Sequence, residues 1–149
     1  MQKHIVIGSD HIGYPLKEHL KTILEKQGWE VEDCGTYHRA RTDYPLYAEK
    51  VAQKINSGEY ERGILICGSG VGMSITANKI HGIRAVVCSE PYSAVLSRKH
   101  NNTNVLCMGS RVVGEELAEM ILWDWLAADY EDGRHQHRLD LIKELEDKY

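Results

Sequence analysis

A cysteine followed by three alternating glycines is the part of this sequence best suited to chemistry. The apolar run 64–66 is typical of a buried strand, and it leads directly into Cys67 and the segment 68–72. From position 73 to 79 the pattern is typical of a helix. A strand, a glycine turn and a helix direct several backbone N–H groups at one point. A thiol at that point should be available as a thiolate base, with the N–H groups as an oxyanion hole.

The residues alone also fit a plainer interpretation. Glycines after a strand often serve only a tight turn, and free cysteines are often inert core residues. No Gly-Lys-Ser/Thr follows, so segment 68–72 is not a Walker A loop. Its glycines alternate, which also differs from the G-x-G-x-x-G dinucleotide pattern. Nucleotide binding is therefore disfavoured.

Three other polar groups have two interpretations each. Asp10 and His11 directly follow a strand, where an aspartate caps a helix about as often as it holds a ligand. Arg134 and Arg138 share one helical face, which is either a solvated face or a clamp for a phosphate dianion. The polar run 100–104 is typical of an ordinary loop.

The elements that must position these residues alternate along the chain. Expected strands are 4–9, 29–34, 64–66, 83–88 and 104–108, and expected helices are 17–26, 45–55, 73–79, 90–100, 115–128 and 134–149. This alternation predicts an α/β fold with a doubly wound parallel sheet in a single domain, 1–149. Ligands bind beyond the carboxyl ends of such strands, which would gather Asp10, His11, Cys67 and Arg111 around one crevice.

Composition narrows the class of protein. The 149 residues carry a formal charge of −4 with a pI near 6.0, which disfavours binding to nucleic acid or a membrane surface. Neither a signal peptide nor a membrane-spanning run is recognisable. The four cysteines are far apart, which favours reduced thiols in the cytoplasm. Of the eight histidines, His135 and His137 are close but face different sides of a helix, so no metal site is expected.

Five long motifs together resemble the type B ribose-5-phosphate isomerases. They are GSDHIGYPLK at 8–17, RTDYP at 41–45, GILICGSGVGMSITANK at 63–79, GIRAVVCSEPYSAVLSRKHNNTNVLCMGSRVVG at 82–114 and GRHQHR at 133–138. The resemblance implies a Rossmann-like three-layer α/β/α sandwich with a five-stranded parallel sheet. It also implies a homodimer that in some members pairs further into a tetramer. The implied activity is interconversion of ribose 5-phosphate and ribulose 5-phosphate in the pentose phosphate pathway without metal or cofactor.

The resemblance also implies roles for individual residues. Cys67 would be the base and His100 the acid that opens the furanose ring. Binding roles would fall to the enediolate-facing loop (Gly68, Ser69, Gly70, Val71, Gly72), the hydroxyl-binding Asp10 and Asn101, the phosphate-binding His11, Arg111, Arg134 and Arg138, and the sugar-facing Tyr44. Ser69 stands where threonine is more usual, and Ser74 stands where some members carry a glutamate base, which supports Cys67 as the base.

Two alternatives stay open, and one further expectation follows from topology. An allose-6-phosphate or galactose-6-phosphate isomerase would share this scaffold, and so would a non-catalytic sugar-phosphate sensor. Cys67 ends a strand, whereas His100 precedes one, so the two should lie at opposite edges of the sheet, about 17–20 Å apart. We therefore expect each active site to combine Cys67 of one subunit with His100 of its two-fold mate.

Overall fold

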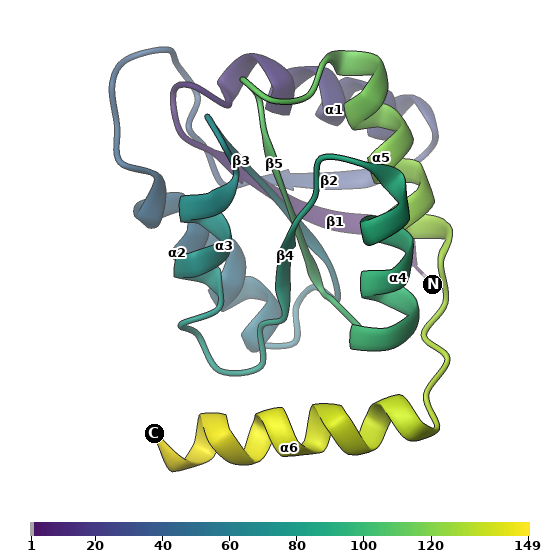
Figure 1. Cartoon of the computed structure of the whole chain (residues 1–149). Helices are drawn as coiled ribbons and strands as arrows, with labels where there is room; N and C mark the ends of the chain where they lie inside the picture. Colours follow the sequence, from purple (N-terminus) through teal and green to yellow (C-terminus); the bar gives the residue numbers. More distant parts are fainter. Residues whose placement is uncertain (1) are drawn as a thin grey trace.

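The computed structural model describes residues 2–149, and at its centre lies a sheet of five parallel strands in the order β2-β1-β3-β5-β4 (Figure 1). The strands are β1 (His4–Ser9), β2 (Glu30–Asp33), β3 (Gly63–Cys67), β4 (Ala85–Val87) and β5 (Val105–Gly109). All residues of β3 and β5 are buried, which explains why both read as continuous apolar runs rather than alternating ones. β2 is an edge strand, as its alternating sequence predicts.

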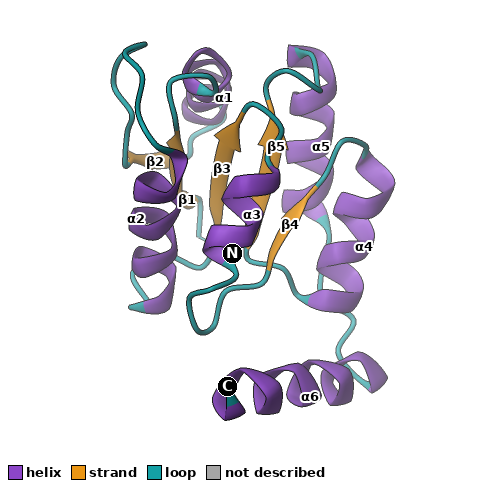
Figure 2. Ribbon diagram, turned by 60° about the vertical axis from the view of Figure 1, so that its left-hand side comes forward, coloured by secondary structure: helices purple, strands orange, loops and turns teal. Residues whose placement is uncertain are grey.

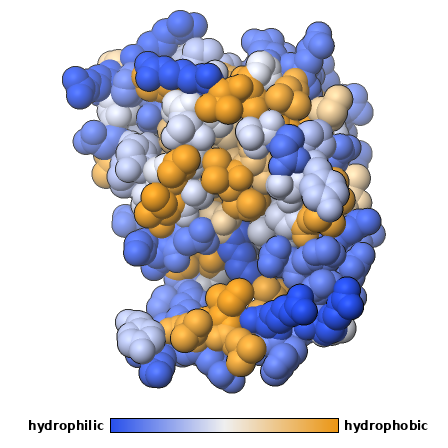
Figure 3. All heavy atoms as spheres, viewed as in Figure 1, coloured by the Kyte–Doolittle hydropathy of each residue, from blue (hydrophilic) through white to orange (hydrophobic). Residues whose placement is uncertain are grey.

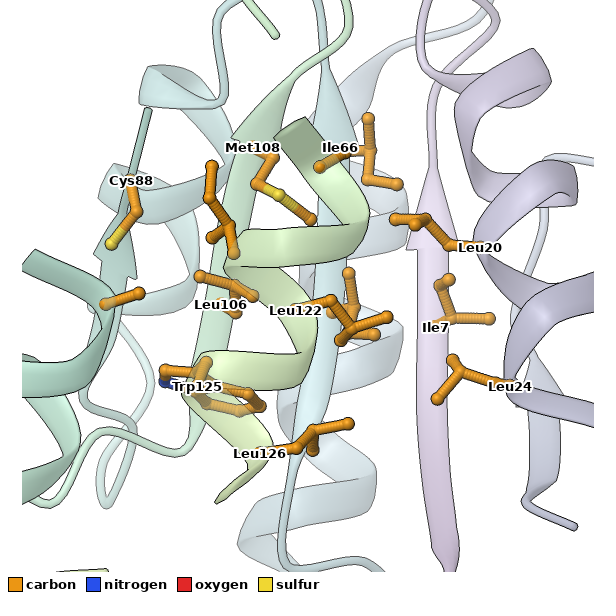
Figure 4. Close-up of a cluster of buried hydrophobic side chains, with 14 of the residues drawn as sticks. Ile7, Leu20, Leu24, Ile66, Cys88, Leu106, Met108, Leu122, Trp125 and Leu126 are labelled. Carbon is orange, nitrogen blue, oxygen red and sulfur yellow. The ribbon is translucent and has the colours of Figure 1, made fainter. Parts of the chain in front are cut away.

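Helices cover both faces of the sheet and complete a three-layer α/β/α sandwich, as expected. The helices are α1 (Tyr14–Lys26), α2 (Tyr44–Asn56), α3 (Val71–Ala77), α4 (Pro91–Asn101), α5 (Glu115–Ala127) and α6 (Arg134–Lys148). On one face, α1, α4 and α5 bury a cluster of apolar side chains that includes Leu20, Leu122 and Trp125 (Figure 4). On the other face, α2 and α3 bury a second cluster against β1, β3 and β5.

Helix α6 lies apart from both layers. It crosses beneath the body at the end opposite to the carboxyl ends of the strands (Figure 2). Its anchors on the body are few: Glu146 Oε1 accepts the N–H of Gly82 at 2.9 Å, and only His135 and Leu139 of this helix are buried. No helix within residues 2–149 has the length and apolar character needed to cross a membrane.

Two helices begin two or three residues earlier than the sequence predicts. Helix α1 starts at Tyr14 rather than at 17, because Pro15 fits the first turn, where its missing N–H has no helical acceptor. Helix α3 starts at Val71, directly after Gly70, whose φ of 80° is a left-handed conformation that glycine adopts readily. The earlier start brings the first turn of α3 against the end of β3.

The strand register aligns the carboxyl ends of the central strands. Ser9 pairs with Ile66, and Cys67 pairs with Gly109. The loops after β1, β3 and β5 therefore leave the sheet side by side at one edge, as the sequence predicts for Asp10, Cys67 and Arg111.

Candidate active site at the carboxyl edge

A cavity of about 620 Å³ opens where these three loops meet. Eight of the predicted site residues line it: Asp10, Tyr44, Cys67, Gly68, Ser69, Val71, Gly72 and Arg111. Three apolar residues, Ile12, Ile75 and Val112, also line it. The sequence gives no signal for these three, because an apolar side chain next to a ligand and one in the core look alike.

Cys67 ends β3 with its thiol almost fully enclosed, at 5 % exposure. Its Sγ accepts the N–H of Gly70 at 3.2 Å. A hydrogen bond donated to sulfur stabilises a thiolate, which is the form that acts as a base. The glycine turn therefore supports the thiol directly as well as bringing helix α3 close to it.

The backbone around the thiol offers free donors. Within residues 2–149, the N–H groups of Gly68, Ser69 and Gly72 donate to no protein acceptor, and all three residues line the cavity. The other two N–H groups of the loop have acceptors: the N–H of Val71 donates to Ser69 Oγ at 3.3 Å, and the N–H of Gly70 donates to the sulfur of Cys67. Three free N–H groups beside one thiol can hold an oxyanion formed next to it.

Close packing fixes the shape of this loop. A Cβ on Gly72 would lie 2.5 Å from the Tyr44 ring, and a Cβ on Gly109 would lie 2.6 Å from the backbone of Ser69. The glycines at these two positions allow the loop to approach the first residue of α2 and the end of β5. Tyr44 is thereby held against the first turn of α3.

The loops after β1 and β5 complete this edge. Asp10 is buried and lines the cavity, and its Oδ1 accepts the N–H of Gly13 at 2.9 Å in the turn ahead of α1. The N-cap of α1 is Gly13, so the interpretation of Asp10 as a helix cap is wrong. The N–H of Arg111 donates to the carbonyl of Gly68 at 3.1 Å, which ties the arginine to the loop. Both side chains therefore face the space beside Cys67.

His11 lies next to this cavity without lining it. Its Nδ1 accepts the N–H of Thr42 at 3.2 Å, so Nδ1 carries no proton and Nε2 is the free nitrogen. The same bond secures the loop that leads into α2 and Tyr44. Gly70 does not line the cavity either, and its N–H donates to the sulfur of Cys67.

The other predicted site residues lie at the opposite edge. His100 and Asn101 end α4, and the exposed Arg134 and Arg138 lie on α6, which Figure 2 places away from the carboxyl ends of the strands. None of the four lines the Cys67 cavity. A five-residue strand, about 17 Å long, separates the two edges. The structure thus brings the predicted residues together as two groups, one at each edge.

His100 has neighbours that the sequence does not predict. Its ring stacks on that of His135, with centroids 4.3 Å apart, and the Nε2 atoms of both rings lie 3.6–3.7 Å from Glu131 Oε1. Burial, followed by the charges of His100 and Arg134, lowers the pKa of His135 from its usual 6.5. No sequence pattern relates positions 35 apart, so the pairing of His135 with His100 was missed.

These three side chains are the candidate metal ligands among residues 2–149, since their ligand atoms lie within 4.8 Å of one another. A metal ion binds in the plane of each imidazole ring. The two rings are inclined by only 15° and stacked, so their planes do not meet at a shared point near both nitrogens. The stacked arrangement therefore does not favour a metal ion held by both rings.

Comparisons with known proteins agree with this geometry. A family model described as Ribose/Galactose Isomerase matches residues 5–142. Ribose-5-phosphate isomerase B of Escherichia coli (strain K12) is 58% identical over 146 residues, 98% of each chain. A Clostridium thermocellum ribose-5-phosphate isomerase B structure superposes with a TM-score of 0.97 at 51% identity, covering 98% of this chain and 99% of that one. A Mycoplasma genitalium ribose-5-phosphate isomerase B structure with bound ribulose-5-phosphate gives a TM-score of 0.93 at 40% identity, covering 98% and 97%. This chain belongs to the ribose/galactose isomerase family.

Proposed function

We propose that this protein interconverts ribose 5-phosphate and ribulose 5-phosphate by an enediolate mechanism, without a cofactor, in the non-oxidative branch of the pentose phosphate pathway. The observation that carries the proposal is the enclosed thiol of Cys67, which accepts one N–H and lies beside three free N–H groups. An aldose–ketose isomerase must remove a weakly acidic proton next to a carbonyl and stabilise the oxyanion that develops. The Cys67 loop supplies groups suited to both tasks.

In this mechanism the Cys67 thiolate takes the proton from C2 of the open-chain sugar. The electron pair of that C–H bond forms the enediolate, whose oxygen is held by the N–H groups of Gly68, Ser69 and Gly72. The hydroxyl proton then shifts from O2 to O1 within the enediolate, and return of the abstracted proton from the Cys67 thiol to C1 gives the ketose and restores the thiolate. Loss of one such donor typically costs about 2.7–4 kcal/mol of transition-state stabilisation.

Binding residues hold the rest of the substrate. Asp10 and Asn101 hold hydroxyl groups, and Tyr44 lies against the sugar. The phosphate is bound by His11, whose Nε2 is its free nitrogen, and by Arg111, Arg134 and Arg138. Binding energy at the unreactive phosphate orients the sugar and helps to lower the barrier.

We infer that each site is shared between two subunits of a homodimer, which can pair further into a tetramer. Support comes from the separation of the residues: Cys67 and Arg111 lie at the carboxyl edge, whereas His100, Asn101, Arg134 and Arg138 lie at the amino edge of the same chain. In a two-fold dimer the His100 group of one subunit lies over the Cys67 cavity of its mate, where His100 can act as the ring-opening acid.

The surface carries apolar side chains that such a dimer can bury. Exposed apolar residues gather on α6 and over the middle of the body (Figure 3). On α6 they are Leu141, Ile142 and Leu145, each 46–58 % exposed, and on α3 they include Val71 and Ile75. Since Val71 and Ile75 also line the Cys67 cavity, an interface on this face would adjoin the site.

We place the enzyme in the cytoplasm. All four cysteines are free and buried, which is typical of a reducing compartment.

A coupled assay with ribose 5-phosphate, allose 6-phosphate and galactose 6-phosphate tests the substrate. We expect kcat/KM to be highest for ribose 5-phosphate. A higher value for a six-carbon sugar would assign the protein to the alternative isomerases. Calorimetric binding of ribose 5-phosphate with no ribulose 5-phosphate formed would instead identify a sensor.

A further inference from the structure

Three arginines converge at the edge of the sheet opposite Cys67. Arg62 directly precedes β3, Arg84 directly precedes β4, and Arg98 lies on α4. Strand β5 lies between β3 and β4, so the two strand-end arginines flank its first residues. All three arginines line one cavity of about 390 Å³ together with the loop residue Asn102.

Arg62 and Arg98 are buried and Arg84 is half-buried, and within residues 2–149 none of the three has an acidic partner at ion-pair distance. Arg62 and Arg98 are 9 % and 6 % exposed. Across residues 2–149, no carboxylate oxygen lies within 4.0 Å of a nitrogen of Arg62, Arg84 or Arg98. Buried charges in proteins are normally paired, because an unpaired one keeps its desolvation penalty.

Neutral groups satisfy only part of the three guanidinium groups. Arg62 Nη1 donates to the carbonyl of Leu126 at 3.1 Å, and Arg84 Nε donates to the carbonyl of Asn102 at 2.8 Å. Arg98 Nη1 donates to Asn102 Oδ1 at 3.1 Å and also to the carbonyl of Thr103, while Arg98 Nε is buried and has no acceptor. Each guanidinium carries five N–H donors, so donors are left over for a further acceptor.

The arginines also repel one another. Burial, then the charges of Arg62 and Arg84, lower the pKa of Arg98 to about 10. The guanidinium carbons of Arg62 and Arg98 lie 5.5 and 5.9 Å from the centre of the same Trp125 ring. The one carboxylate on the cavity wall belongs to the exposed Glu61, which is too far away for an ion pair. A bound anion would relieve this repulsion.

We propose that the cavity between Arg62, Arg84 and Arg98 is a binding site for a tetrahedral oxyanion of the phosphate class. The planar fork of a guanidinium matches two oxygens of such an ion, and arginines from three segments of the chain line this cavity. The site is separate from the Cys67 cavity, since the two share no lining residue. The cavity adjoins the His100 group at the amino edge of the sheet. Arg84 and Arg98 both donate to Asn102, which directly follows Asn101.

Calorimetric titration with inorganic phosphate at constant ionic strength tests the site. The starting protein for this titration is the Arg134→Gln/Arg138→Gln double variant, in which phosphate binding by the proposed substrate clamp is reduced. We expect binding to persist in this protein and to weaken at least about tenfold when Arg62→Gln is added, because charge-assisted hydrogen bonds are lost. Arg39→Gln, which removes an exposed arginine elsewhere, should leave the affinity unchanged.

A second variant keeps the test decisive if Arg62→Gln does not fold. Glu61→Gln removes the exposed carboxylate on the cavity wall and should tighten phosphate binding. The phosphate group could belong to the free ion or to a phosphate monoester. Titration with phenyl phosphate distinguishes these two ligands, because a site built for the free ion binds the monoester more weakly. Absence of phosphate binding in the starting protein, equal affinity in the Arg62→Gln and Arg39→Gln proteins, or no effect of Glu61→Gln would overturn the proposal.

Discussion

The sulfur of Cys67 accepts a backbone N–H, whereas within residues 2–149 no hydrogen bond reaches the sulfur of Cys34, Cys88 or Cys107. Burial, then the charge of Glu32, raises the pKa of Cys34 to about 11. Burial, then the charge of Glu90, raises that of Cys88 to about 11 as well. Cys34 and Cys88 are therefore protonated near neutral pH. Cys67 is the thiol placed to act as a base, because it lines the cavity at the carboxyl edge and accepts an N–H.

Cys67→Ala should abolish turnover and leave binding of ribose 5-phosphate largely intact, because the role proposed for the thiol lies in the chemical step. Steady-state kinetics and calorimetry measure the two effects, with Cys34→Ala as a control that keeps its activity. Alkylation near pH 7 should modify Cys67 first, and substrate should slow it. A variant with more than about a tenth of the normal kcat, a barrier change below about 1.4 kcal/mol, would exclude Cys67 as the base.

Arg134→Ala and Arg138→Ala should each mainly raise KM, because in the proposed mechanism these residues hold the unreactive end of the substrate. A charge-assisted bond of this kind contributes about 1.5–3 kcal/mol, equivalent to a change of about tenfold or more. Arg138→Lys should rescue only in part, since the lysine lacks the fork.

Lys143→Ala is the matched control for these arginine variants, because it removes an exposed cation from the same helix. Normal KM values for ribose 5-phosphate in both alanine variants would show that the two arginines do not hold the phosphate.

At the scale of elements, the start of α1 depends on a close approach between two backbones. A Cβ on Gly13 would lie 2.4 Å from the carbonyl oxygen of Ile66, in the strand that carries Cys67. The same turn is held by Asp10, whose carboxylate accepts the N–H of Gly13. The position of α1 and the position of the site are therefore set by one contact.

Gly13→Ala should lower the free energy of unfolding by about 2 kcal/mol or more, because a backbone oxygen cannot move aside as a side chain can. Urea denaturation measures the change. Gly114→Ala is the control: its Cβ would meet no atom within 4 Å, so the change should be limited to the loss of a glycine N-cap of α5, less than about 1 kcal/mol. Equal effects of the two substitutions would contradict the backbone clash.

Helix α6 should be held more weakly as the pH falls. The folded-state pKa of His135 lies below its usual 6.5, so below that pH the unfolded chain binds more protons at this residue than the folded one. The contribution of His135 to stability is complete above pH 6.5 and is lost as the pH falls through the folded-state value.

Comparison of His135→Gln with the original protein in urea between pH 7.5 and 5 isolates this contribution. The free energy of unfolding should depend less on pH in His135→Gln than in the original protein. The dependence should persist in His137→Gln, which changes an exposed histidine of the same helix. An unchanged slope in His135→Gln would assign the pH dependence to other groups.

Local patterns were enough to predict most elements, because apolar runs, glycine stops and prolines act within a few residues. The start of α3 was missed by two residues, because it depends on the left-handed conformation of Gly70 and on packing with β5 and Tyr44. The grouping of Asp10, Cys67 and Arg111 was predictable, because parallel strands end at one edge. The stacking of His100 on His135 and the convergence of Arg62, Arg84 and Arg98 were not, because they depend on where α4, α5 and α6 cross the far edge.

At the scale of the whole molecule, the two groups of site residues can be tested by mixing subunits. Cys67→Ala and His100→Ala should each be inactive alone. If subunits exchange at random, half of the dimers are mixed and each has one intact site of two, so activity should recover to about a quarter of normal.

The mixed dimers can be isolated with two affinity tags, which also proves that exchange has taken place. A mixture of Cys67→Ala with Cys67→Ala/His100→Ala is the matched control, because none of its sites regains a thiol. Inactive mixed dimers of the first pair would show that both residues act within one chain.

The separation of Cys67 from His100 along the sheet has a consequence for how the rate depends on dilution. If neither edge alone turns over substrate, a lone chain has no turnover, and the working catalyst is an assembled pair. Below the dissociation constant of that pair, the rate should rise with the square of the total protein concentration, and above it the dependence should become linear. A chain with a damaged site would then reduce the output of the intact chains with which it pairs.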